Sequence, residues 1–71
     1  MNYNIHYKIV IALEPDNHNA HFGRGRAYYH LGYTILAKSD WENALKLAKE
    51  ANHVAAKTYE GALHELKEKR R

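Results

Sequence analysis

The clearest pattern along the chain is a stripe of small and apolar residues that begins after Ile35. Its members recur every three or four positions, which is the spacing of one face of an α-helix. No proline or glycine lies between Gly32 and Gly61. The pattern predicts one long helix, or two helices bent near Asn52-His53. The stripe consists of Ala37, Trp41, Ala44, Leu45, Ala48, Ala51, Ala55, Thr58, Ala62 and Leu66.

The N-terminal stretch, residues 3–17, fits two patterns at once. Apolar residues at alternate positions are typical of a half-buried strand, and this stretch alternates from Tyr3 to Leu13. With helical spacing, the same residues form two adjoining apolar faces instead. Periodicity alone does not choose between strand and helix here, so the choice depends on the rest of the chain.

Two breaks divide the chain. Proline disfavours helix in the residue before it and can itself begin a helix, so Pro15 is the strong break. Asp16 or Asn17 is then expected to cap the helix that follows. Gly32 suits the left-handed residue that ends a helix, and Thr34 is expected to cap the next one.

A shift of 34 residues, a period used by repeat arrays, aligns the chain with itself. Tyr7 then falls on Trp41 and Ile11 falls on Leu45, so large residues meet large ones. Since the segment around Trp41 has a helical pattern, the N-terminal stretch is predicted to be helical too. A strand remains the alternative.

The run RGRAYYHLGYTILAKSDWENAL, residues 24–45, resembles the core of a tetratricopeptide repeat (TPR), a helix-turn-helix unit of 34 residues. The preceding ALEPDN, residues 12–17, resembles the end of a previous unit, including its proline. The matching small, aromatic and turn positions are Gly25, Tyr28, Gly32, Ala37, Trp41 and Ala44.

The chain departs from the family pattern at three positions. His21 stands where the family has tryptophan, Arg24 where it has leucine, and Lys49 where it has proline. The last segment is not a proper repeat. It resembles the solvating helix that closes many arrays, with a polar face of Lys57, Glu60, His64 and Lys67.

The resemblance implies an all-α fold: a TPR-like α-hairpin stack, or short right-handed α-solenoid, of three to four antiparallel helices. Residues 1–71 would form a single domain. Within it, residues 3–14 would be the second helix of a partial repeat, 17–50 one complete repeat and 52–69 a capping helix. The partial repeat lacks the helix that normally packs on it. We therefore expect a longer array, or self-association through Tyr3, Ile5, Ile9 and Val10.

Composition adds a few limits. The 71 residues carry a net charge of +3 and include no cysteine, so no disulfide and no thiolate zinc site is expected. No apolar run approaches the roughly 20 residues that cross a bilayer, and the N-terminus lacks the pattern of a secretion signal. A soluble, cytoplasmic protein is the expectation.

The resemblance also implies where a partner binds. The first helices of such repeats line a concave groove that takes peptides, C-terminal tails or a partner helix. Arg26 would pair with a carboxylate by two parallel hydrogen bonds. For Phe22 the alternative is packing within the repeat, and for Arg26 a solvated surface charge. The implied groove residues are Asn19, Phe22, Arg26, Tyr29 and His30.

No catalytic, metal or cofactor site is expected. The six histidines include pairs spaced by three, His18 with His21 and Glu50 with His53, but spacing nominates no further ligands. The glycines of FGRGR lie within a helical segment and form no phosphate loop. A non-enzymatic module that binds a protein partner is therefore the favoured interpretation.

Two other classes of function remain as alternatives. A small assembly subunit would dock through its N-terminal apolar face rather than through the groove. Nucleic-acid binding is less favoured, because acidic residues are interleaved with the cations that would contact phosphates. Those cations are Arg24, Arg26, Lys38, Lys46, Lys49, Lys67, Lys69, Arg70 and Arg71.

Overall fold

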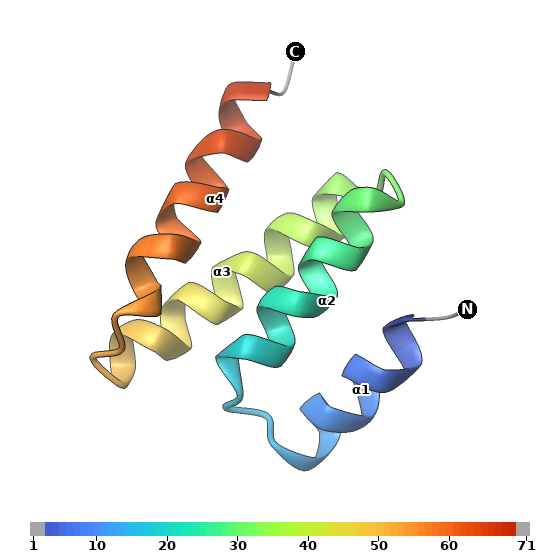
Figure 1. The fold of residues 1–71 in the computed structure, drawn as a ribbon, viewed down its shortest axis with the longest axis vertical. Helices are drawn as coiled ribbons and strands as arrows, with labels where there is room; N and C mark the ends of the chain where they lie inside the picture. The colour runs from blue at the N-terminus through green and yellow to red at the C-terminus, as the bar shows by residue number, and fades with distance from the viewer. Residues whose placement is uncertain (1–2, 70–71) are drawn as a thin grey trace.

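Helices form almost all of the structure, which is a computed structural model that describes the backbone of residues 3–69 and the side chains of residues 5–67. In chain order the helices are α1 (Tyr3–Leu13), α2 (His18–His30), α3 (Thr34–Glu50) and α4 (Ala55–Lys69) (Figure 1). No strand occurs within the described residues. The prediction of an all-α fold is confirmed, and the strand alternative for the N-terminal stretch is wrong.

The start of α2 follows the prediction, whereas the start of α3 does not. Asn17 is the N-cap of α2, and its side-chain oxygen accepts a hydrogen bond from the Ala20 amide at 3.1 Å. Thr34 was expected to cap α3, but it is the first residue of that helix. The N-cap is Tyr33, whose side chain makes no capping hydrogen bond.

Two helices end in the same kind of turn. Gly32 has a φ of 89°, and the Tyr33 amide donates to the Tyr28 carbonyl at 2.9 Å. Asn52 has a φ of 53°, and the His53 amide donates to the Ala48 carbonyl at 2.8 Å. These are Schellman motifs, in which a left-handed residue lets the last carbonyls of the helix find donors. The second motif answers the question left open by the sequence, because it separates α3 from α4.

Each helix packs on the next one in the chain, and the contact between α2 and α3 is the most extensive. Successive helices run in alternating directions, with α3 crossing behind α2 in Figure 1. The Cα atoms span 36 × 33 × 13 Å. An α-helix with its side chains is about 10–12 Å wide, so the molecule is a flat plate. None of the described helices is both long and apolar enough to cross a membrane.

The core is built from small residues around two aromatic rings. Ala37, Ala44 and Ala48 of α3 are fully buried, which lets the neighbouring helices approach closely. Of the two aromatic residues that match the repeat pattern, Trp41 is buried, whereas Tyr28 is only half-buried. Tyr59 was not anticipated, yet it is only 2% exposed. Two members of the predicted stripe are exposed: Ala51, which is the C-cap of α3, and Thr58, which lies after the turn at Asn52 that resets the helical phase.

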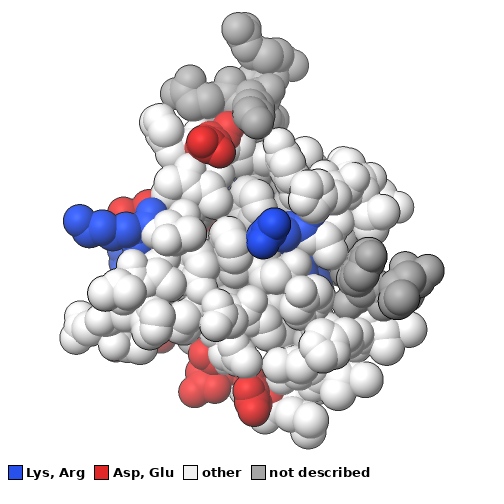
Figure 2. Space-filling view, viewed as in Figure 1, with Lys and Arg blue, Asp and Glu red and all other residues white. Residues whose placement is uncertain are grey.

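Charges are sparse on one broad face of the plate. Figure 2 shows only a few scattered Lys, Arg, Asp and Glu side chains over α1, α2 and α4, and most of the visible surface is uncharged.

Candidate functional site

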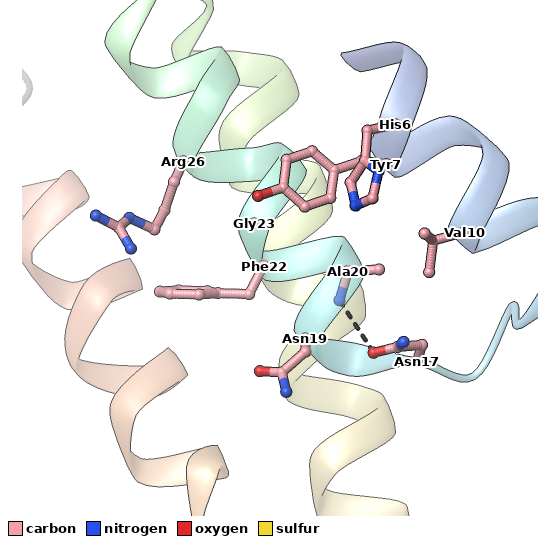
Figure 3. Close-up of a pocket in the computed structure, with 9 residues that line it drawn as sticks. All are labelled: His6, Tyr7, Val10, Asn17, Asn19, Ala20, Phe22, Gly23 and Arg26. Carbon is pink, nitrogen blue, oxygen red and sulfur yellow. Dashed lines mark hydrogen bonds between the residues drawn. The ribbon is translucent and has the colours of Figure 1, made fainter. Parts of the chain in front are cut away.

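Two adjoining cavities are lined by residues of α1 and α2, and Figure 3 shows the lining of the first, which extends over α2 toward α4. Their volumes are about 380 Å³ and about 340 Å³, and both are lined by Tyr7, Gly23 and Arg26. We call the two cavities together the α1–α2 groove. Its residues are His6, Tyr7, Val10, Asn17, Asn19, Ala20, Phe22, Gly23, Arg26, Ala27, His30 and Leu31.

The groove owes its shape to Gly23, which stands where the Tyr7 ring crosses α2. A Cβ atom at this position would lie 2.6 Å from Cε1 of Tyr7, so any side chain would displace the ring. His6 packs edge-on against Tyr7 at a centroid distance of 5.4 Å. The wall that α1 contributes is therefore aromatic.

Phe22 connects the groove to the core. Its ring stacks on Trp41 at 5.4 Å and lies 4.6 Å from the Tyr59 ring, between centroids. The indole Nε1 of Trp41 donates to the Phe22 carbonyl oxygen at 3.2 Å. Phe22 therefore packs within the helical stack and also presents a fixed aromatic surface to the groove.

Arg26 is exposed and carries the only Lys or Arg charge among the described residues that line the groove. Neither an aspartate nor a glutamate lines it. The ion pairs among the described residues involve His21, Arg24 and Lys49, and none of them includes Arg26. In Figure 3 its guanidinium points toward the α4 side of α2, beyond Phe22.

Four of the five predicted groove residues come together. Asn19, Phe22 and Arg26 line the first cavity, and His30 joins Arg26 in the second. Tyr29 is turned away and lines a separate cavity of about 110 Å³ beside Trp41.

The groove also contains residues that the sequence did not assign to it. The sequence analysis did not assign His6 and Tyr7 to it, although the 34-residue shift aligned Tyr7 with Trp41. Val10, predicted for the self-association face, lines the groove instead. Ile5 and Ile9 of that face are 56% and 55% exposed, and the side chain of Tyr3 lies outside the described residues.

The two histidines of the first α2 turn have separate partners, so their spacing by three does not bring them to a common site. The His21 ring is buried, and its Nε2 donates to the Pro15 carbonyl at 3.0 Å. His18 lies against α4 instead, with Nδ1 2.7 Å from the Tyr59 hydroxyl. Within the described residues, no group of three or more His, Cys, Asp or Glu side chains is arranged to hold a metal ion.

Arg24 and Asp40 form an ion pair that the sequence did not predict. Nε and Nη2 of Arg24 donate to the two carboxylate oxygens at 2.8 and 2.7 Å, and the Asp40 side chain is only 5% exposed. The hydrogen bonds to Asp40 raise the pKa of Arg24 above its ordinary value. This guanidinium is therefore occupied, and the phosphate contact considered for it in the nucleic-acid alternative would compete with Asp40.

The rings of His18 and His53 lie in contact, tilted by 57° with a centroid distance of 4.5 Å, between α2 and the turn that precedes α4. The His53 Nδ1 accepts a hydrogen bond from the Ala55 amide at 3.0 Å. Burial, with a smaller contribution from His53, lowers the pKa of His18 below its ordinary value of 6.5. Burial also raises the pKa of the neighbouring Tyr59 hydroxyl.

The lowered pKa of His18 predicts a loss of stability in mild acid. Below its ordinary value of 6.5, the unfolded chain binds the proton more readily than the folded one. His18 therefore makes its full contribution to the free energy of unfolding above pH 6.5. This contribution declines as the pH falls through 6.5 toward the lower pKa of the folded state. Urea unfolding followed by circular dichroism, at about pH 7.5 and about pH 5.5, tests this.

The variant His18→Gln is expected to reduce the pH dependence, because glutamine does not titrate. His30→Gln at the exposed end of α2 is the matched control and should leave the His18 contribution in place. Equal pH dependence of wild type and His18→Gln would contradict the prediction.

No protein-family model matches the chain, and neither a curated protein nor a solved structure matches it. The tetratricopeptide-repeat resemblance therefore stays a prediction. Function is inferred from the residues of the α1–α2 groove themselves.

Proposed function

We propose that this chain is a non-enzymatic, cytoplasmic interaction module, with the architecture of a short TPR-like stack, that binds a peptide or helix of a partner protein in the α1–α2 groove. The observation that carries the proposal is the groove itself. It has aromatic walls, amide side chains and one unpaired arginine, with no carboxylate among its described lining residues.

Three features support the TPR-like architecture. The α2–α3 hairpin coincides with the segment that resembles a complete repeat. Gly25 lies directly against the Trp41 ring, which is the combination of small and aromatic residues that the resemblance assigns to facing helices. Pro15 lies just before the hairpin, and α4 follows it as a further helix with an exposed polar face.

The polar groups of the groove suit a peptide backbone. The side-chain oxygen of Asn19 accepts from the Tyr59 hydroxyl at 3.4 Å, which leaves its amide nitrogen free to donate to a ligand carbonyl. Tyr7 and Phe22 supply rigid apolar surface on either side of α2. A ligand with apolar side chains and an accessible backbone matches these surfaces.

Arg26 adds a preference for an acidic group. A planar guanidinium binds a carboxylate through two parallel, charge-assisted hydrogen bonds. Because no acidic residue of the groove competes for it, a glutamate, aspartate or terminal carboxylate of the partner is the matching group. A nucleic acid is matched less well, since its affinity depends on many phosphate contacts and the face in Figure 2 carries few cations.

Selection from a library of random peptides displayed on phage, with the whole chain as bait, tests this function. We expect the enriched peptides to combine apolar residues with at least one acidic residue. Arg26→Gln should weaken their binding by about tenfold, the loss of one charge-assisted contact. Lys46→Gln, which removes the same charge from an exposed position on α3 outside the groove, should have little effect.

Absence of any enriched peptide would contradict the proposal, and so would equal effects of the two substitutions. Tight, strongly salt-dependent binding of single-stranded RNA without peptide enrichment would favour the nucleic-acid alternative instead.

A further inference from the structure

The first part of α4 contacts α2 through a buried aromatic side chain. The Tyr59 ring is buried, and its centroid lies 4.6 Å from that of Phe22. The Tyr59 hydroxyl donates to the side-chain oxygen of Asn19 at 3.4 Å and lies 2.7 Å from Nδ1 of His18. Because the hydroxyl proton is directed to Asn19, the His18 Nδ1 donates to the hydroxyl oxygen. The lone pair of neutral His18, where a further proton would bind, is therefore on Nε2.

The first turn of α4 depends on a second histidine. The His53 Nδ1 accepts a hydrogen bond from the Ala55 amide at 3.0 Å, and the His53 carbonyl accepts one from the Ala56 amide at 3.1 Å. The amides at the start of a helix have no partner within the helix, so a side chain that accepts from them acts as a cap. Only neutral imidazole can accept, because both ring nitrogens of the protonated form are donors. Protonation of His53 therefore removes this cap.

The two imidazole rings lie where positive charge is unfavourable. Their centroids are 4.5 Å apart, so two protonated rings would repel each other. His18 is the first residue of α2, and His53 stands two positions before the first residue of α4. The N-terminal end of a helix carries a partial positive charge, which opposes a cation placed there.

The charged groups around His53 do not offset a charge on its ring. A cavity of about 340 Å³ beside this ring is lined by Lys49 of α3 and Lys57 of α4, and no Asp or Glu residue lines it. Lys49 is itself paired with Glu60 of α4 at 3.5 Å. Among the described residues, no carboxylate forms an ion pair with His53.

The surroundings of His18 also favour its neutral form. The acidic residues that precede α2 are Glu14 and Asp16, and neither pairs with His18. Glu14 accepts a hydrogen bond from the Asn17 side chain at 3.0 Å instead. On the α4 side, burial raises the pKa of Tyr59, so the hydroxyl that contacts His18 stays uncharged. Burial, with a smaller contribution from His53, lowers the pKa of His18.

We propose that His18 and His53 form an acid-sensitive latch that holds the start of α4 against α2. While both rings are neutral, they pack on each other and His53 caps α4. When both rings are protonated, the cap is lost and the rings repel, so α4 separates from the α2–α3 pair. The contact between α2 and α3 is the most extensive in the molecule, so these two helices stay together. The release of α4 needs no ligand, so this proposal does not depend on the proposed function.

Native-state hydrogen exchange of the whole chain at about pH 7.5 and about pH 5 tests the latch. Protection factors, which correct for the intrinsic effect of pH on exchange, are compared between helices. From the higher to the lower pH, those of Tyr59 and Ala62 in α4 should fall at least about tenfold more than those of Ala44 and Ala48 in α3. This is the scale of a lost helix cap together with a like-charge contact. An equal fall in both helices, or no fall in α4, would overturn the proposal.

Substitutions assign the effect to the two rings. The double variant His18→Gln with His53→Asn does not titrate at these positions, and asparagine can still accept from the Ala55 amide. Its extra loss of α4 protection in acid should disappear. The single variant His53→Asn should reduce that loss, and it provides the same test if the double variant does not fold. His30→Gln, at the exposed end of α2, is the matched control and should behave as the wild type. A loss that persists in both His53 variants, or that disappears in His30→Gln, would overturn the proposal.

Discussion

Replacement of Arg24 by alanine is expected to lower the free energy of unfolding by about 3–5 kcal/mol. The substitution leaves the Asp40 carboxylate, whose side chain is only 5% exposed, without the guanidinium that donates two hydrogen bonds to it. A core of this size supplies roughly 3–5 kcal/mol in total. The variant should therefore be largely unfolded at room temperature by circular dichroism.

Two comparisons distinguish the effect of the buried Arg24–Asp40 pair from the effect of removing any surface charge. Lys49→Ala removes a partner from the Lys49–Glu60 pair, whose side chains are 59% and 53% exposed, and should cost less than about 1 kcal/mol. The double variant Arg24→Met with Asp40→Leu should recover most of the stability, because apolar side chains of similar volume replace both charges. Equal losses for Arg24→Ala and Lys49→Ala would contradict this view of the α2–α3 interface.

The second large effect is expected at Gly25. In Gly25→Ala the new methyl group would overlap the Trp41 ring, which its hydrogen bond to the Phe22 carbonyl holds in place. The Cβ of Asp40 would also lie only 3.1 Å away. Overpacking of this kind costs about 1–3 kcal/mol. Thermal and urea unfolding should both show the loss.

Gly61→Ala is the matched control for the same substitution. Gly61 lies inside α4, and a Cβ there would have no neighbouring atom within 4 Å. Because alanine loses less backbone freedom than glycine on folding, this variant should gain about 0.5–1 kcal/mol. A gain of stability at both glycines would show that the α2–α3 contact is not as close as described.

The helices could be predicted from the sequence wherever a repeated spacing or a distinct turn residue marked them. The 34-residue shift identified α1 as a helix when its alternation suggested a strand, and Pro15 and Gly32 marked the ends of α2. The end of α3 was left undecided, because Asn52 adopts a positive φ without the glycine that usually signals it. Thr34 was misassigned as a cap because a capping residue type does not by itself fix the first helical turn.

The groove was predictable only on its α2 side. The resemblance to the repeat family implied Asn19, Phe22, Arg26 and His30 there, and it also implied Tyr29, which lines a different cavity. The α1 side depends on how the short segment between α1 and α2 directs the chain, and no residue pattern specifies that direction. Tyr7 could not be placed over Gly23 for this reason. The Arg24–Asp40 pair was missed because its members are 16 positions apart on different helices.

The most direct test of groove binding is a two-dimensional amide NMR titration of the whole chain with the most enriched acidic peptide. We expect the amide signals of Ala20, Gly23 and Ala27 to shift together, whereas those of Val54 and Lys57 stay in place. A version of the peptide with its acidic residue replaced by the corresponding amide should need a higher concentration for the same shifts. Shifts confined to α4 or the α3–α4 turn, or none at all, would contradict the assignment of the α1–α2 groove as the binding site.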